Sequence, residues 1–430
     1  MTGRNPGRPD RTSLTTSRGA ALYIGALLGP GLLLLPGLAA AEAGPASILA
    51  WLALLGLSGL FAAVFSALGR RFPQAGGVIG YVTAGLGRPA GQAAGWSFLI
   101  GVIAGAPIVC LIGAGYVTDL IGGGRLATSV AAALLLLAVL VLAAIGLRAS
   151  TGVQLVLVGL LITLVTVAVA GSASSVTTAN WTPFAPHGWP SVGRAATTLM
   201  LSFIGWEAVA PLTTRFARPA RQLPRVIAIA LATTSALYLG LAVVTIGVLG
   251  PASATSVPLA ALLGRAVGTA GPAVAAVAAV LLTMGTVNAY VTGAEAMARQ
   301  LLGRDAVAER GSAHASGFLA AITAASVALI TLYGFRLASV ASLVIVPTAL
   351  FLAVYLGCML TAVRVFGGPV RRIAVTAALA VVVMLAYCGW ALAIPAIVAL
   401  AARASARRGQ ARGVPHLPRD TQAAPSCSPL

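Results

Sequence analysis

Two short stretches of the chain carry the residue types that could hold a polar ligand or exchange a proton. The first is Gly29-Pro30-Gly31, in the middle of an apolar run. Glycine disfavours a helix and proline lacks a backbone donor, so the helix is expected to break there. The second is Ser-Phe-Ile-Gly-Trp-Glu at 202–207, where Glu207 is the acid that lies deepest within an apolar run. We expect the freed backbone groups of these stretches to line a cavity.

Glu207 has two readings. A carboxylate within a membrane span is costly and is by default a functional hypothesis, so it could take up and release a proton while the protein works. It could instead accept hydrogen bonds that tie two helices together. The first reading makes Glu207 a possible coupling or gating residue, and the second gives it a structural role.

The elements that position these residues are long apolar segments. The chain has 430 residues, of which 59% are hydrophobic and 8% charged. Its apolar runs repeatedly exceed the roughly 18 residues that indicate a membrane span. The sequence therefore predicts an all-α polytopic membrane protein with twelve transmembrane helices, at 20–42, 46–68, 90–119, 126–147, 153–171, 193–212, 225–249, 272–297, 314–333, 337–362, 372–387 and 389–403.

The basic residues predict the orientation. All 27 are arginines and the net charge is +19, which in a soluble chain would indicate nucleic acid. With twelve spans and a cytoplasmic N-terminus, only Arg125, Arg194, Arg265 and Arg336 fall outside the cytoplasmic segments, as the positive-inside rule requires. We therefore expect a lipid bilayer around the protein, no nucleic acid, and both termini in the cytoplasm. Whether 373–402 is one span or two stays open.

Other classes of protein fit less well. A cleaved signal peptide has an apolar core of about 7–15 residues, which the run at 20–41 exceeds. Three histidines and four cysteines are scattered, so we expect neither a metal site nor a membrane-embedded enzyme. A channel would require a ring of polar residues or a filter motif.

The two interrupted spans, the first and the sixth, lie five spans apart. Five is odd, so the two halves run oppositely through the membrane, which is typical of the inverted repeats of transporters. We assign repeat 1 to 19–171, repeat 2 to 193–362 and two extra helices to 372–403, which together form the permease domain at 19–403. The polar leader 1–18 and tail 404–430 are predicted to be disordered.

Several motifs resemble those of the amino acid/polyamine/organocation permeases, and most resemble the bacterial exporters of methionine and branched-chain amino acids. The resemblance implies a LeuT-like fold, no cofactor, and a location in the bacterial cell membrane. The matching stretches lie at 29–36, 41–45, 69–78, 202–207, 217–225 and 288–299.

The resemblance also implies a site for an amino acid zwitterion where spans 1 and 6 unwind. Its carboxylate would lie on amides near Gly29 and Gly31, and its ammonium on carbonyls around residues 203–205. Pro30 departs from the family, which has Ser or Thr there, so the carboxylate must depend on Gly31 and Leu32. The expected substrate-binding residues are Gly29, Pro30, Gly31, Leu32, Phe203, Ile204, Gly205 and Trp206.

These residues are largely apolar, and apart from Glu207 the spans have no deep acid or base to neutralise a charged side chain. We therefore expect a secondary active transporter of neutral apolar amino acids that works by alternating access. The resemblance favours export, with import or exchange as alternatives. The coupling ion, H⁺ or Na⁺, and the oligomeric state stay open.

Overall fold

The computed structural model describes most of the chain between its two ends, and Pro30, the leader before residue 14 and the tail after residue 411 lie outside the described residues. The described part is almost entirely helical, and its one extended pairing is an isolated bridge between Leu14 and Phe216. The described residues are 14–29, 31–73, 77–145, 151–208, 216, 218–302 and 311–411.

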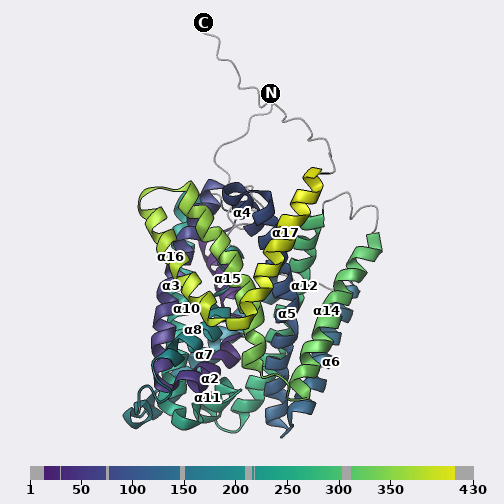
Figure 1. Ribbon diagram of the computed structural model, residues 1–430. Coiled ribbons are helices and arrows are strands. Elements are labelled where there is room, and N and C mark those ends of the chain that lie inside the picture. The colour runs from purple at the N-terminus through teal and green to yellow at the C-terminus, as the bar shows by residue number, and fades with distance from the viewer. Residues whose placement is uncertain are drawn as a thin grey trace, which may run out of the picture.

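The first half of the chain begins with a divided helix, followed by long apolar helices (Figure 1). Its elements are α1 (Thr16–Leu27), α2 (Gly31–Ala43), the 3-10 turn η1 (Gly44–Ala46), α3 (Ser47–Arg71), α4 (Val78–Leu86), α5 (Arg88–Leu120), α6 (Arg125–Ala144), α7 (Thr151–Ser172), η2 (Ala173–Ser175) and η3 (Thr178–Trp181).

The second half begins with another divided segment. Its elements are α8 (Pro190–Leu199), η4 (Met200–Phe203), η5 (Trp206–Ala208), α10 (Pro219–Leu249), η6 (Gly250–Ser253), α11 (Pro258–Val267), α12 (Ala270–Leu302), α14 (Gly311–Gly334), α15 (Val340–Val365), α16 (Gly368–Tyr387), η7 (Gly389–Leu392) and α17 (Ala393–Ala411).

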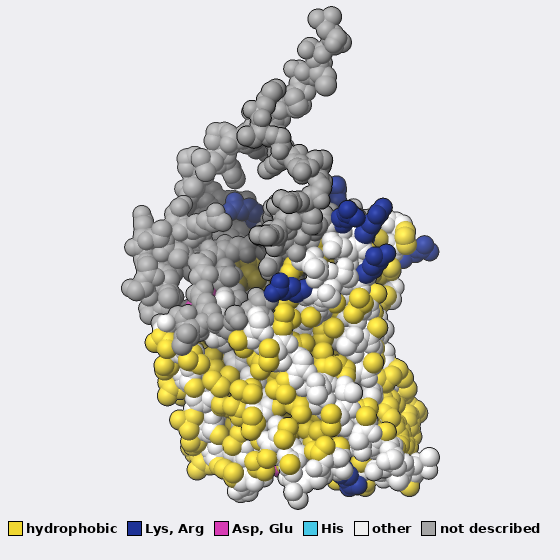
Figure 2. All heavy atoms as spheres, turned by 180° about the vertical axis from the view of Figure 1, so that it is seen from behind, with side chains coloured by type: hydrophobic (Ala, Val, Ile, Leu, Met, Phe, Trp, Pro, Cys, Tyr) yellow, Lys and Arg dark blue, Asp and Glu magenta, His cyan; other side chains and the backbone are white. Residues whose placement is uncertain are grey.

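The outer surface of the bundle is apolar, as expected of a protein that is surrounded by lipid. On α6, exposed leucine and valine side chains recur every three or four residues, at Leu126, Val130, Leu134, Leu137 and Val141. Figure 2 shows a broad hydrophobic surface with most of the visible arginines gathered at one end. The C-terminal end of α17 lies at the same end in Figure 1. The fold is thus a helical, multi-pass membrane protein.

Eight segments of the described residues are long and apolar enough to cross a membrane, so the predicted count of twelve is not confirmed. The difference has a physical cause. The first and sixth predicted spans are each divided, so neither forms one long helix, and α2 and α3 are counted together across η1. Three shorter apolar helices lie at Pro258–Val267, Ala320–Gly334 and Gly389–Ser405.

Two helices, α4 and α11, lie between predicted spans, where loops are expected. Helix α4 is bracketed by Gly77 and Gly87, both with positive φ angles, and α11 is followed by Gly268, whose φ is also positive. Each helix is too short to span a membrane. A glycine that ends a helix cannot be distinguished from a loop glycine in the sequence, so these two short helices are not predicted.

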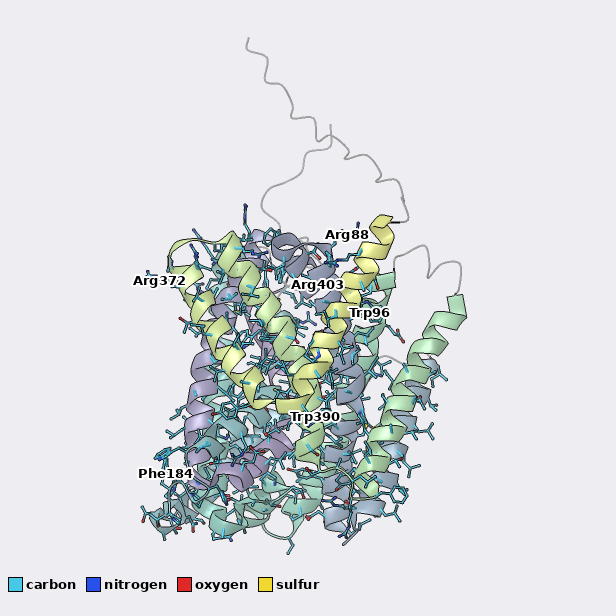
Figure 3. The ribbon with its side chains drawn as sticks, in the orientation of Figure 1. Arg88, Trp96, Phe184, Arg372, Trp390 and Arg403 are labelled. Atoms are coloured by element: carbon cyan, nitrogen blue, oxygen red, sulfur yellow. The ribbon has the colours of Figure 1, made fainter. Side chains whose placement is uncertain are left out.

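The apolar stretch at 373–402 forms two helices, α16 and α17, separated at Cys388 and Gly389. Gly389 has a φ of 55°, which allows the sharp reversal. The two helices form a V with Trp390 at its apex (Figure 3). Helix α17 extends to Ala411 rather than ending at residue 403, because alanine and arginine are strong helix formers.

Candidate functional site

The first break separates α1 from α2 at Leu28 and Gly29, in the middle of the first predicted span. The backbone amides that follow α1 bond back to its last turn: the Leu28 N–H donates to Ile24 O at 2.7 Å, and the Gly29 N–H donates to Leu27 O at 3.1 Å. The Leu32 N–H at the start of α2 donates to Gly29 O at 3.1 Å. Of the two amides on which carboxylate binding was expected to depend, that of Leu32 is therefore engaged.

The second break separates η4 from η5 at Ile204 and Gly205. Ile204 is extended, and Gly205 has a φ of 148° that L side chains rarely adopt. A β carbon on Gly205 would clash with the carbonyl oxygen of Ala26 in α1. Glycine at this position therefore allows the two breaks to lie against each other.

Two tyrosines on other helices hydrogen-bond to the backbone groups that the breaks release. The hydroxyl of Tyr238, on α10, lies 2.6 Å from Leu27 O and 2.8 Å from Ser202 O, and it can donate to either carbonyl. The hydroxyl of Tyr355, on α15, accepts from the N–H groups of Gly205 and Trp206 at 3.1 and 3.2 Å. Both breaks are thus held in place by the surrounding bundle.

Glu207 belongs to the second of these hydrogen-bond networks. Its Oε2 accepts from the Tyr355 hydroxyl at 2.6 Å and from the Gly205 N–H at 3.0 Å. The carboxylate therefore folds back onto the break that precedes it and connects this break to α15. This geometry corresponds to the second reading of Glu207, in which the side chain ties helices together.

A cavity of about 450 Å³ lies beside the two breaks. This volume is within the range of about 300–1,000 Å³ that is typical of small-molecule sites. Its walls come from α1, both breaks, α5, α7 and α12. The lining residues are Ala21, Leu22, Gly25, Ala26, Leu27, Leu28, Gly29, Gly31, Val109, Ile112, Gln154, Leu155, Leu157, Val158, Leu201, Ser202, Ile204, Leu282, Gly285, Thr286, Ala289 and Tyr290.

The described cavity wall is mainly apolar. Its polar side chains are Gln154, Ser202, Thr286 and Tyr290, and none of the described lining residues is charged. Such a wall suits a ligand whose own polar groups are met by backbone atoms at the breaks. Among the described residues, no group of three or more His, Cys, Asp or Glu side chains could hold a metal ion.

Three of the residues expected to bind substrate, Gly29, Gly31 and Ile204, line the cavity, and a fourth, Pro30, lies outside the described residues. The other four, Leu32, Phe203, Gly205 and Trp206, are not among its lining residues.

Phe203 and Trp206 instead pack into the bundle on the other side of the break. Phe203 contacts the rings of Trp51 and Tyr238, with centroids 6.0 and 5.2 Å away. The indole N–H of Trp206 donates to Ser58 Oγ at 2.8 Å. These two side chains therefore help to hold the second break in place.

The comparisons with known proteins agree with this architecture. A family model described as amino acid permease matches residues 14–356. The chain belongs to the amino acid permease family. The predicted membership of the amino acid/polyamine/organocation permeases is thereby confirmed, and the chain is a transporter rather than an enzyme.

Three relatives of the permease come from bacteria. It is 30% identical over 404 residues to the uncharacterized amino acid permease YecA of Bacillus subtilis, covering 90% of this chain and 94% of YecA. It is 29% identical over 393 residues to the L-methionine/branched-chain amino acid exporter YjeH of Escherichia coli, covering 88% of this chain and 92% of YjeH. A branched-chain amino acid permease of Bacillus subtilis, BcaP, is 28% identical over 247 residues, 53% of each chain.

Proposed function

We propose that the permease is a secondary active transporter that exports neutral apolar amino acids across the bacterial cell membrane by alternating access. The observation that carries this proposal is the uncharged, mainly apolar cavity beside the two breaks. An uncharged wall disfavours a substrate with an ionised side chain, because an unpaired charge in an apolar site is costly. Each buried methylene contributes about 0.8 kcal/mol, which favours leucine or methionine over alanine.

The proposed site holds the two charged ends of a zwitterion on backbone groups. The N-terminus of α2 presents the N–H of its first residue, Gly31, to the carboxylate, and the helix dipole favours a negative charge there. The carbonyls of residues 203–205 receive the ammonium. Both groups of backbone atoms adjoin cavity-lining residues, Gly31 and Ile204.

We further propose twelve spans in two inverted repeats, with the arginine-rich end of the molecule in the cytoplasm. Arg88, Arg372 and Arg403 lie toward one end of the molecule, whereas Phe184 lies near the opposite end (Figure 3). Because positive residues are enriched on the cytoplasmic side of membrane proteins, this distribution supports the orientation.

In this orientation the cavity is proposed to open to the cytoplasm. Its lining includes Ala21 in the first half of α1 and Gln154 in the first turn of α7, so the cavity extends from the breaks toward the beginnings of these two helices. On the other side, the Tyr116 hydroxyl donates to Leu33 O at 2.6 Å and accepts from the Leu259 N–H at 3.3 Å. These bonds hold α2 against α11 and support closure of the external side.

Counterflow of labelled leucine into proteoliposomes tests the transport proposal. Unlabelled leucine or methionine inside the vesicles should drive saturable uptake of labelled leucine. Either amino acid should compete with the label at least tenfold better than alanine does, because about two or three extra buried carbons correspond to roughly 2 kcal/mol of binding free energy. The absence of counterflow with all twenty amino acids would refute amino acid transport. A preference for arginine or glutamate would contradict the apolar site.

Direction is tested in a strain without its own exporters, loaded with leucine- or methionine-containing dipeptides. The similarity to YjeH supports export. Expression of the permease should lower the internal amino acid and relieve growth inhibition. Faster uptake of external leucine with unchanged internal pools would reverse the proposed direction.

A further inference from the structure

Ser202 combines burial with an unpaired hydroxyl. Its side chain is 4% exposed and lines the cavity, and its Oγ has no hydrogen-bond partner among the described residues. A serine within a helix commonly donates to a carbonyl three or four residues earlier. Ser202 does not, and a buried hydroxyl without a partner is destabilising. The hydroxyl is therefore available to a ligand in the cavity.

The Ser202 hydroxyl lies next to the first residue of α2. A β carbon built on Gly31 would be 3.1 Å from Ser202 Oγ, so the missing side chain of Gly31 leaves the hydroxyl close to the helix N-terminus. The first N–H groups of a helix have no partner within the helix, and the dipole there attracts anions. A single anionic group at this helix end would therefore be within reach of the hydroxyl as well.

The backbone of Ser202 is fixed independently of the hydroxyl. Its carbonyl oxygen lies 2.8 Å from the Tyr238 hydroxyl, which also reaches Leu27 at the first break. The neighbouring side chain of Phe203 is packed against Trp51 and Tyr238. The position of the Ser202 hydroxyl relative to α2 therefore does not depend on a bound ligand.

We propose that the Ser202 hydroxyl donates a hydrogen bond to the α-carboxylate of the transported amino acid, beside the N–H of Gly31. This inference rests on the proposed function. Proline at position 30 has neither a hydroxyl nor an N–H to offer. Ser202, from the other break, supplies a donor to the same end of the substrate, so both broken segments recognise the carboxylate.

Binding of leucine and leucinamide to the purified permease, measured by calorimetry, tests the role of Ser202. Leucinamide retains the ammonium and the side chain but replaces the carboxylate with a neutral amide. A hydrogen bond to a charged group corresponds to a tenfold or greater change in affinity. Ser202→Ala should raise the Kd for leucine at least tenfold and change the Kd for leucinamide by less than threefold.

Ser326→Ala is the matched control. Ser326 is also a fully buried serine with an unpaired Oγ among the described residues, but it lies on α14 and is not one of the described lining residues of the cavity. Its substitution should leave both Kd values unchanged. Ser202→Thr keeps the hydroxyl and should retain the preference for leucine over leucinamide, which keeps the test decisive if the alanine variant does not fold.

The outcomes separate this inference from the proposed function. If the wild-type permease binds no amino acid, the proposed function fails and the inference fails with it. If it binds leucine but Ser202→Ala changes nothing, or weakens leucine and leucinamide equally, the carboxylate is held elsewhere and only the inference is overturned. The inference would also be overturned if Ser202→Thr lost the preference for leucine over leucinamide while Ser202→Ala kept it.

Discussion

Replacing Glu207 with glutamine separates the charge of this residue from its hydrogen bonds. The Oε2 atom accepts from Tyr355 at 2.6 Å and from Gly205 at 3.0 Å. A glutamine amide oxygen can take the same place. Hydrogen bonds to a charged acceptor contribute about 1.5–3 kcal/mol each and neutral ones about 0.5–1.5 kcal/mol, so Glu207→Gln should cost about 2 kcal/mol over the two bonds.

Glu207→Ala removes the oxygen that accepts both hydrogen bonds, from the Tyr355 hydroxyl and from the Gly205 N–H. The two lost charge-assisted bonds correspond to about 3–6 kcal/mol. We therefore expect the melting temperature of the detergent-purified permease to fall in the order wild type, glutamine, alanine. The control is Asp119→Asn, near the end of α5 and away from both breaks, which should melt as the wild type does.

Transport assays on the same variants distinguish the two roles of Glu207. If the carboxylate carries a proton, Glu207→Gln should keep leucine exchange and lose accumulation driven by a pH gradient. If it only ties the second break to α15, both activities should survive in the glutamine variant and fall in the alanine variant. Wild-type stability and transport in both variants would refute the reasoning for either role.

Three further predictions concern the backbone, the first break and the topology. Gly205→Ala should abolish leucine counterflow and lower the melting temperature, because a β carbon there would clash with Ala26 O and a φ of 148° strains any L side chain. Counterflow at the wild-type level would mean that the two breaks can move apart to accept the β carbon. Pro30→Ser adds a hydroxyl and an N–H near the proposed carboxylate site, so the Kd for leucine should fall up to about tenfold while that for leucinamide stays constant; an equal change in both would place the carboxylate elsewhere. A cysteine replacing Phe184 should react with an impermeant maleimide on intact cells and one replacing Arg372 should not, and the reverse pattern would invert the proposed topology.

The two breaks could be predicted from the sequence because their cause is local. Glycine and proline weaken a helix, and Gly29 and Gly205 lie at the breaks that the structure has, although α5 and α15 continue through Pro107 and Pro347. The orientation of the side chains around a break is different. Residues 200–203 form a 3-10 turn, so the 3.6-residue period does not predict that Ser202 faces the cavity while Phe203 faces the bundle.

The partners of the breaks could not be predicted because they come from distant parts of the chain. Tyr238 and Tyr355 lie on long, largely apolar helices, and their sequence neighbours give no sign of a role. The Tyr355 hydroxyl meets Glu207 across 148 positions and the Tyr238 hydroxyl meets Leu27 across 211. Only the packing of α10 and α15 against the divided segments reveals which polar groups pair.

The Tyr238 hydroxyl has one proton and two carbonyl oxygens within reach, one at the end of α1 and one in η4. Rotation of the hydroxyl is enough to move its hydrogen bond from one carbonyl to the other. If one of these contacts lengthens, the other remains available, so the buried hydroxyl keeps a hydrogen bond. Helix α10 therefore stays hydrogen-bonded to the divided segments through whichever of the two carbonyls remains within reach.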